Sequence, residues 1–289
     1  MKHYYIWIAV LILTACRQEI STDVNIPVVT SAFETNTPIP TSTPVFTPTP
    51  AFPLPQVLLA GPISIVAIGD DITRGDGDDL GRGYPGRLLE LVTQIRPGSW
   101  ITNFSQSGWT SGDLVNGTVD FSGQLGRAVS EVNSAVGQRR GSVVLVWTGE
   151  HDLWELYTGE EPVTREKEDQ DVARFSGNIN TIIFTLREAG AEVIIAQLDD
   201  QSQRPARTRS EIYPNITAEE LDRMSLQVQR YNGVIADIAN RHNALTVNFY
   251  GSDIFIKDAT LASDGYHPNP AGYDLITQSW YKTLIKILP

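Results

Sequence analysis

The stretch Ser64-Ile65-Val66-Ala67-Ile68-Gly69-Asp70-Asp71-Ile72-Thr73-Arg74-Gly75 decides the fold of this chain. A short, mostly apolar run ends in a glycine and two acids, and a glycine-rich segment with a helix-like pattern follows. Such a run predicts a buried strand that delivers polar side chains to its C-terminal end. Because ligands bind at that edge in open α/β sheets, we expect the functional residues there.

Short β-branched runs alternate with longer helical patterns along the rest of the chain. We predict strands at 64–68, 100–104, 143–148, 192–198 and 244–249, and helices at 84–95, 121–136, 171–189, 217–242 and 270–287. Asn269 and Pro270 predict the cap and the first position of the last helix. This alternation predicts a parallel sheet that is covered by helices on both faces.

The N-terminal region has the features of an export signal. Lys2 and His3 precede an apolar run that ends at Leu13-Thr14-Ala15-Cys16 and is too short to span a bilayer as a permanent helix. The tetrapeptide resembles a bacterial lipobox, which implies cleavage before Cys16 and lipid attachment to its sulfur. The alternative is a plain secretory signal with an incidental cysteine. Cys16 is the only cysteine, so no disulfide forms within the chain.

A segment rich in Thr, Pro, Ser and Asn follows Cys16. It lacks apolar periodicity, and its prolines remove backbone donors, so we expect an extended, disordered stalk. We therefore predict a lipoprotein signal peptide at 1–15, a Thr/Pro-rich stalk at 16–56 and one domain at 57–289. The protein would lie outside the cytoplasm, anchored to the bacterial cell membrane by its N-terminal lipid.

The charge balance is acidic, with 34 Asp and Glu against 22 Lys and Arg and a formal net charge of −12. Nucleic acids are bound through clustered Lys and Arg, so this balance argues against a nucleic-acid partner. It suits a well-solvated protein outside the cell, which we expect to be a monomer.

Four short blocks in the expected order resemble the SGNH (GDSL) hydrolase family. They are Gly69 to Gly75, Asn103 to Gly108, Trp147 to Asp152 and Asp264 to Pro268. The resemblance covers most of residues 57–289. It implies a flavodoxin-like three-layer α/β/α sandwich with a five-stranded parallel sheet, the SGNH hydrolase fold, and a carboxylic-ester hydrolase activity.

The resemblance also implies roles for individual residues. In the family a serine of the first block is the nucleophile, and the Asp-x-x-His of the last block, here Asp264 and His267, supplies orienter and base. A serine hydroxyl needs a histidine to take its proton, and the histidine needs a carboxylate on its other nitrogen. Gly108 stands where the family's glycine offers a backbone N–H to the oxyanion.

The chain departs from the family pattern at two positions. Asp71 replaces the nucleophilic serine, and His151 replaces the asparagine of the third block, which adds an oxyanion donor in the family. A carboxylate has no proton for His267 to remove, and it repels a developing oxyanion. Because His151 can carry a positive charge, we interpret the pair as a compensated exchange.

Three interpretations of this site remain open. The domain is inactive or very slow as a serine esterase and serves binding, or it is an altered hydrolase that uses Asp71 with His267 and Asp264 on an ester or acylated glycan. The third is a metal-dependent hydrolase with Asp71, His151 and His267 as ligands. We expect no cofactor and no resident metal, and the ligand would be a small molecule or a glycan ester.

The acidic turn Asp76 to Asp79, after the first block, resembles the start of a calcium-binding loop. Counted from Asp76, however, the twelfth position is Arg87, where an EF-hand needs a glutamate. We therefore interpret Asp76-Gly-Asp78-Asp79 as a solvated turn.

Two segments fit poorly as simple connectors. Residues 155–170 are acidic and long, and residues 199–215 carry Arg204, Arg207 and Arg209. Loops of this length on such a scaffold are lids, binding loops or surface insertions.

The lipobox resemblance predicts that Cys16→Ser releases the protein from the membrane, because the serine hydroxyl cannot accept the thioether-linked lipid. We expect the wild type in the membrane fraction and the variant in the soluble or secreted fraction, measured by immunoblotting after cell fractionation. A variant that stays wholly in the membrane fraction would refute lipid anchoring through Cys16.

Overall fold

The computed structural model describes residues 51–55, 58, 61–159, 163–208 and 216–288. Five strands form one sheet: β1 (Ile63–Gly69), β2 (Trp100–Asn103), β3 (Gly141–Trp147), β4 (Glu192–Gln197) and β5 (Leu245–Asn248). Their order is β2-β1-β3-β4-β5, and all neighbouring pairs are parallel. The predicted fold class is confirmed, and all five strands lie where the sequence predicts them.

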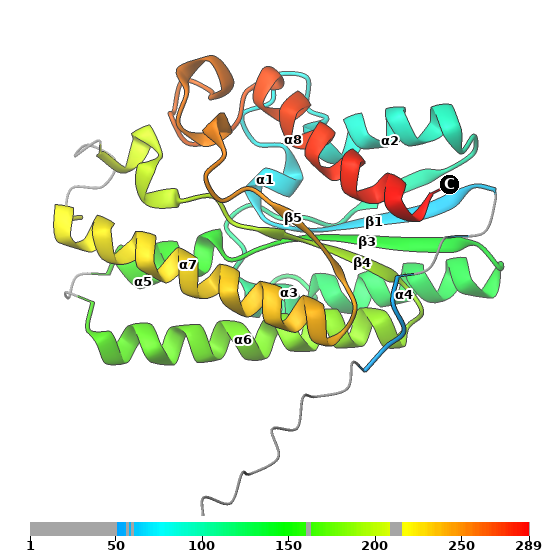
Figure 1. The fold of residues 1–289 in the computed structure, drawn as a ribbon, viewed down its shortest axis with the longest axis horizontal. Coiled ribbons are helices and arrows are strands. Elements are labelled where there is room, and N and C mark those ends of the chain that lie inside the picture. Colours follow the sequence, from blue (N-terminus) through cyan, green and yellow to red (C-terminus); the bar gives the residue numbers. More distant parts are fainter. Residues whose placement is uncertain (1–50, 56–57, 59–60, 160–162, 209–215, 289) are drawn as a thin grey trace, which may run out of the picture. The chain divides into compact units, whose positions relative to one another are not determined.

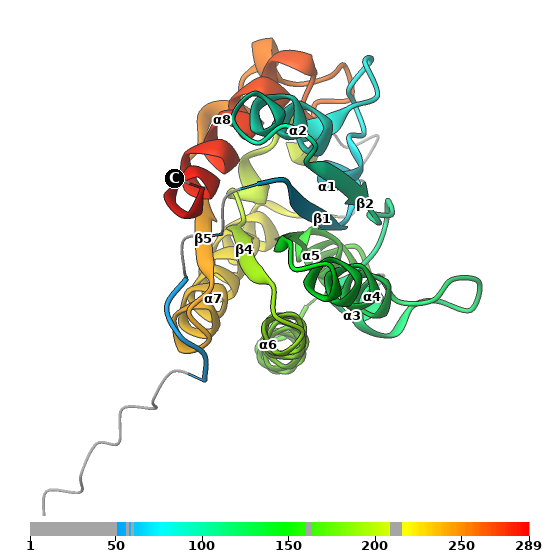
Figure 2. The ribbon, with the colours of Figure 1, turned by 90° about the vertical axis from the view of Figure 1, so that its right-hand side faces the viewer.

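Helices cover both faces of the sheet (Figures 1 and 2). The short α1 (Asp71–Arg74) lies with α2 (Gly83–Ile95) and α8 (Pro270–Leu284) on one face. The other face carries α3 (Ser111–Asn116), α4 (Gln124–Gly137), α5 (Glu150–Tyr157), α6 (Arg165–Glu188) and α7 (Ala218–Arg241). Five short 3₁₀ segments complete the described structure at 201–203, 205–208, 253–255, 258–260 and 285–287.

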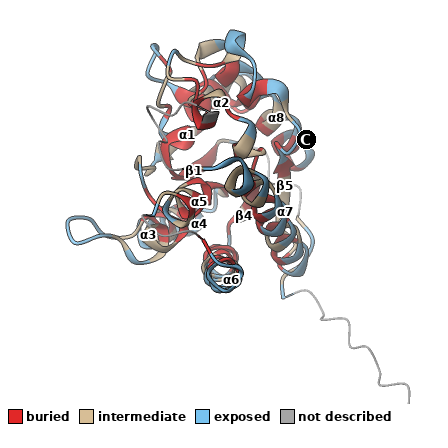
Figure 3. Cartoon of the chain, turned by 90° about the vertical axis from the view of Figure 1, so that its left-hand side faces the viewer, coloured by how far each residue is buried: buried red, intermediate tan, exposed pale blue. Residues whose placement is uncertain are grey.

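Burial follows this layering (Figure 3). Every residue of β1 is buried, as expected for a central parallel strand covered on both faces. On the α2 and α8 face, a cluster of aromatic rings fills the space between helices and sheet. Trp147 of β3 stacks on Phe249 with ring centroids 4.3 Å apart, and Tyr84 stacks on Trp280 at 5.1 Å. This apolar interior fixes the strand ends, which carry the polar side chains of the site.

Two long helices begin at residues that cap them. Thr217 forms a capping box with Glu220 at the start of α7, and His242 is its C-cap. The side chain of Asn269 accepts a hydrogen bond from the N–H of Gly272 at 3.0 Å, and Pro270 takes the first helical position of α8. The predicted cap of the last helix is confirmed.

The segment 155–170 is not a long loop. It contains the end of α5 and the start of α6, whose N-cap Thr164 accepts a hydrogen bond from the N–H of Lys167 at 3.2 Å. The charged first turn of α6 lacks the apolar periodicity by which longer helices are predicted. The short helices α1, α3 and α5 were missed because four to eight residues are too few to display a period.

The signal peptide at 1–15, Cys16 and most of the predicted stalk lie outside the described residues. Residues 51–55 are described, and the N–H of Ala51 donates to the carbonyl of Arg241 at 3.0 Å, while Phe52 lies 5.7 Å from Phe184 between ring centroids. The packed domain therefore extends ahead of the predicted boundary at residue 57. Among the described residues, no helix is long and apolar enough to cross a membrane.

Gly69 ends β1 in a position that admits no side chain. A Cβ there would lie 2.2 Å from the carbonyl oxygen of Trp147 and 2.4 Å from Oγ1 of Thr73. The side chain of Gln124, at the start of α4, accepts from the Gly69 N–H at 2.8 Å and donates to its carbonyl at 2.9 Å. This turn sets the position of Asp71 two residues later.

We predict that Gly69→Ala lowers the free energy of unfolding by roughly 3 kcal/mol, because the added methyl forces β1 away from β3. Gly177→Ala is the control, since Gly177 lies in α6 with open space around the added Cβ, and alanine there should raise stability by about 0.5 to 1 kcal/mol. Urea denaturation followed by circular dichroism measures both. Equal effects of the two substitutions would contradict the close contact at Gly69.

Candidate functional site

Asp71 lies at the start of α1, directly beyond the C-terminal end of β1. Its side chain is 8% exposed. Oδ1 accepts a hydrogen bond from the backbone N–H of Gly108 at 2.7 Å. Because Gly108 follows β2, this bond joins the ends of two neighbouring strands. A Cβ at Gly108 would meet open space, so its φ of 81°, and not a lack of room, is what favours glycine there.

His151 lies in the first turn of α5, beyond the end of β3. Its Nε2 lies 2.8 Å from Oδ2 of Asp71. Strands β1 and β3 are neighbours on either side of the point where the strand order reverses, which is the usual ligand site of such sheets.

Asp264 and His267 belong to the turn that precedes α8. Oδ2 of Asp264 lies 2.7 Å from Nδ1 of His267, and Oδ1 accepts the backbone N–H groups of Tyr266 and His267. Nε2 of His267 lies 3.4 Å from Oδ2 of Asp71. The structure thus brings together Asp71, Gly108, His151, Asp264 and His267, the five candidate residues that it describes; the sixth, Cys16, lies outside the described residues.

The two imidazoles determine the charge state of Asp71. Burial alone raises the pKa of this carboxyl, but the hydrogen bonds from His151 and His267 outweigh it and hold the pKa well below its usual range. Burial lowers the pKa of each histidine, and the contact with Asp71 reverses this and raises it to about 9. At neutral pH, Asp71 is therefore an anion between two imidazolium cations.

A second charged cluster lies beneath the site and was missed by sequence reasoning. The guanidinium of Arg204, fully buried, donates through Nε and Nη2 to Asp199 at 2.8 Å each and lies 3.0 Å from Oε2 of Glu150. Asp70 is also buried, and burial, followed by repulsion from Glu150 and Asp71, raises its pKa well above the usual range. Glu150 directly precedes His151, so this cluster supports the site.

Arg204 and Arg207 are part of an alternating stack of aromatic and guanidinium groups. The guanidinium of Arg204 lies 4.7 Å from the ring of Phe255 and 4.6 Å from that of Tyr266. That of Arg207 lies 5.1 Å from Tyr266 and 5.2 Å from Trp154. Both arginines are buried, so residues 204–207 of the segment 199–215 pack against the site rather than forming an exposed loop. Residues 209–215, including Arg209, lie outside the described residues.

This stack of aromatic and guanidinium groups borders a pocket of about 270 Å³ that contains Asp71 in its lining. The residues around it are Asp71, His151, Trp154, Ala206, Asp264, Tyr266 and His267. Its aromatic sides and its few polar groups at one end are typical of a small-molecule site.

The helix that carries His151 is tied to the loop that carries Gly108. Asp152, fully buried, accepts the N–H and the hydroxyl of Ser111 at 2.7 and 2.6 Å, and Asn178 donates to the same hydroxyl at 2.9 Å. These bonds fix α5 against α3 and thereby hold the distance between the two donors to Asp71. Ser111 thus serves a structural bond.

Two sets of possible metal ligands occur among the described residues. The oxygen and nitrogen atoms of Asp71, Asp76 and His267 lie within 4.8 Å of one another, and so do those of Asp71, Glu150 and His151. Neither set contains both imidazoles, so the ligand set that we considered from the sequence, Asp71 with His151 and His267, differs from the sets that the structure offers.

Residues 67–275 match the model of the GDSL-like lipase/acylhydrolase family. The chain belongs to this family. Its resemblance is therefore to carboxylic-ester hydrolases, as the four sequence blocks predict. No curated protein sequence matches the chain.

Solved structures support the fold. A variant of an acetyl xylan esterase from Geobacillus stearothermophilus has a TM-score of 0.52 at 20% identity, covering 78% of this chain and 96% of its own. The psychrotrophic esterase EstA from Pseudoalteromonas sp. has a TM-score of 0.50 at 20% identity, covering 77% and 97%. A lipase/acylhydrolase from Enterococcus faecalis has a TM-score of 0.51 at 18% identity, covering 78% and 97%.

We predict that Arg204→Met lowers the free energy of unfolding by about 3 to 5 kcal/mol, because it leaves the carboxylates of Asp199 and Glu150 buried without their cation. Arg230→Met is the matched control. Arg230 pairs with Asp169 at the surface, where both side chains are exposed, so its loss should cost less than about 1 kcal/mol. Urea denaturation of both variants tests this, and a small effect at Arg204 would show that the buried cluster does not stabilise the fold.

Proposed function

We propose that this domain keeps the SGNH hydrolase fold and its pocket but is inactive or very slow as a serine esterase. In this proposal Asp71 stands at the position of the family's nucleophilic serine, and His151 at that of its asparagine. The observation that carries it is the contact of Asp71 with three donors at once, the Gly108 N–H and Nε2 of both histidines.

Each of these contacts opposes acyl transfer. The carboxylate offers no proton for His267 to take, and its low pKa makes it a weak base and nucleophile. His267 is cationic at neutral pH and cannot act as a general base in that state. The Gly108 N–H is already bonded to Asp71, so a substrate oxyanion would meet an anion where the family offers a donor.

The pocket supports binding without rapid turnover. Its walls include Trp154 and Tyr266, whose rings are held by buried arginines, and its polar end contains both hydrogen-bond donors and acceptors. We propose a small ester or an acylated glycan as the ligand. The likeness in fold to an acetyl xylan esterase supports this class.

We also propose the domain's setting. A lipidated Cys16 and the Thr/Pro-rich segment at 16–56 would anchor one copy of the chain to the bacterial cell membrane and display the domain outside the cytoplasm. The support is the sequence Leu13 to Cys16 and the composition of the segment that follows.

We predict that the wild type hydrolyses p-nitrophenyl acetate very slowly and that Asp71→Ser raises kcat/KM on the order of 100-fold, because the new hydroxyl can use His267 as its base. Adding His151→Asn should raise the rate further by returning a neutral amide donor. His151→Asn alone should destabilise the fold, since Asp71 loses one of its two imidazolium partners.

Asp71→Asn is the matched control, because it removes the same charge but supplies no hydroxyl, and it should stay slow. His267→Ala should abolish the gain in the Asp71→Ser background. Circular dichroism verifies folding of every variant. A fast wild type that loses its activity in both Asp71→Ser and Asp71→Asn would show that Asp71 is itself catalytic and would favour the altered hydrolase.

A further inference from the structure

Asp76 lies beside the site because of the glycine that follows it. Gly77 has a φ of 83°, and a Cβ there would lie 2.6 Å from Cβ of His267 and 2.7 Å from the carbonyl oxygen of Pro268. Only a glycine lets the turn after α1 pack this closely against the turn that carries His267. The two turns are 190 residues apart in the sequence, so their proximity could not be predicted from it.

From the sequence we expected Asp76 to lie in a solvated turn, but the structure shows that it is held by three hydrogen bonds. Its N–H donates to the carbonyl of Asp71 at 3.1 Å, and its carbonyl accepts from the hydroxyl of Tyr273 at 2.8 Å. Its carboxylate accepts a hydrogen bond from the hydroxyl of Ser107. Asp76 is thus held at both backbone groups and at the side chain, with 31% of the side chain exposed.

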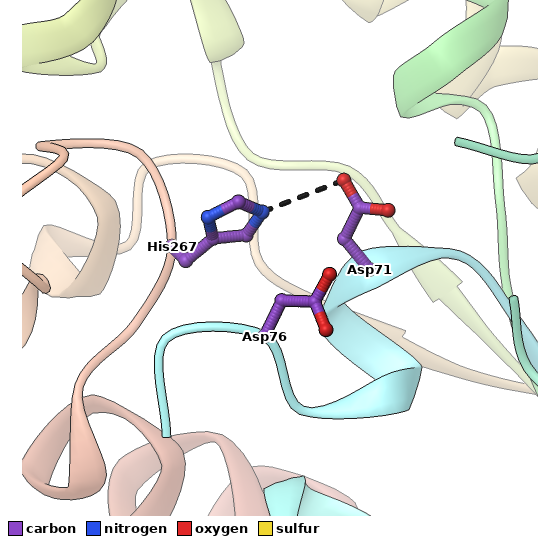
Figure 4. Close-up of side chains that lie close together, drawn as sticks. All are labelled: Asp71, Asp76 and His267. Atoms are coloured by element: carbon purple, nitrogen blue, oxygen red, sulfur yellow. Dashed lines mark hydrogen bonds and ion pairs between the residues drawn. The ribbon is translucent and has the colours of Figure 1, made fainter. Parts of the chain in front are cut away.

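Figure 4 shows the result of this placement. The carboxylates of Asp71 and Asp76 and the imidazole of His267 face one another, with one ligand atom from each within 4.8 Å of the other two. Carboxylate oxygens and imidazole nitrogens are both ligands of divalent ions such as zinc. The nearest cation on the outer side is Arg74, whose Nε lies 3.7 Å from Asp76 and whose side chain is 54% exposed.

The distance between Nε2 of His267 and Oδ2 of Asp71 suits a bridging ion as well as a long hydrogen bond. Nε2 of His151 lies 2.8 Å from Oδ2 of Asp71, a normal charge-assisted hydrogen bond. Nε2 of His267 lies 3.4 Å from the same oxygen, so its hydrogen bond is longer and weaker than the usual one. Zinc bonds of about 2.0 to 2.2 Å at a tetrahedral angle place a nitrogen and an oxygen ligand about 3.4 Å apart.

The other nitrogen of His267 is arranged as in many metal sites. Nδ1 lies 2.7 Å from Oδ2 of Asp264, which orients the ring so that Nε2 faces Asp71 and Asp76. Carboxylate partners of this kind fix the tautomer of metal-binding histidines and raise their basicity.

We propose that Asp71, Asp76 and Nε2 of His267 form a reversible binding site for a divalent cation of the zinc class, which binds as Nε2 releases its proton to solvent. Cation binding at this site depends neither on an ester ligand nor on whether the domain hydrolyses esters. It differs from the set considered from the sequence, because Asp76 takes the place of His151. With three protein ligands, one of them part-exposed, it binds added zinc rather than holding a resident ion.

The test uses the full chain, solubilised in detergent without a polyhistidine tag, titrated with zinc chloride by isothermal calorimetry. We expect saturable binding that weakens at least tenfold in Asp76→Asn, which removes a ligand and keeps the shape of the side chain. Asp79→Asn is the matched control. It removes the same charge from the same turn at an exposed residue outside the cluster and should change the affinity less than twofold.

Histidine side-chain NMR of the wild type makes the test independent of any variant's folding. The chain has four histidines, and zinc should shift the Nε2 signal of His267 while leaving that of His242, which bonds to Asn180 on another part of the domain, unchanged. Zinc affinity that is equal in wild type and Asp76→Asn, or a His267 signal that does not respond, would overturn the proposal.

Discussion

The carboxylate of Asp71 is the group on which the site depends. It is acceptor-only when ionised, so every group that forms a hydrogen bond with it must donate. The donors are the Gly108 N–H, His151 in the first turn of α5 and His267 in the turn before α8, which belong to three separate segments of the chain. A serine hydroxyl at the same place would both donate and accept, and it would need no cation beside it. The carboxylate at residue 71 therefore constrains the protonation state of both histidines.

The fold must offset the cost of burying these charges. Asp71, Glu150 and Asp199 are buried carboxylates, and their partners are His151, His267 and the fully buried Arg204. Removing a partner leaves a buried charge with less compensation. This loss costs more free energy than the intact pair contributes to stability. Strand β1, which is buried throughout, and β3, which is buried from its second residue on, supply the apolar burial that makes such a cluster tolerable.

The sequence predicts this architecture well because its signals are local. The five strands are short β-branched runs, and the caps at Thr217 and Asn269 lie at the ends of long helices. Four short blocks predicted the five described candidate residues, which the structure brings together. What the sequence could not indicate depends on contacts between distant segments: Arg204 reaches Glu150 across 54 residues, and Asp76 reaches His267 because Gly77 admits a close approach. The sequence placed Arg204 in a segment interpreted as a lid, binding loop or surface insertion, since no local pattern indicates the aromatic rings that surround it.

Asp71 takes part both in the proposed inactive esterase site and in the proposed cation site. The two sites differ in the other neighbours of Asp71 that they involve. His151 contacts Asp71 but lies outside the cluster with Asp76, whereas the carboxylate of Asp76 accepts a hydrogen bond from the Ser107 hydroxyl. The bond between Gly108 and Oδ1 involves the oxygen that neither histidine contacts. A cation between His267 and Oδ2 could therefore bind while Oδ1 still occupies the Gly108 N–H, so cation binding by itself would not open the site to an ester. Turnover depends on the chemistry of residue 71, and ion binding depends on the turn that presents Asp76.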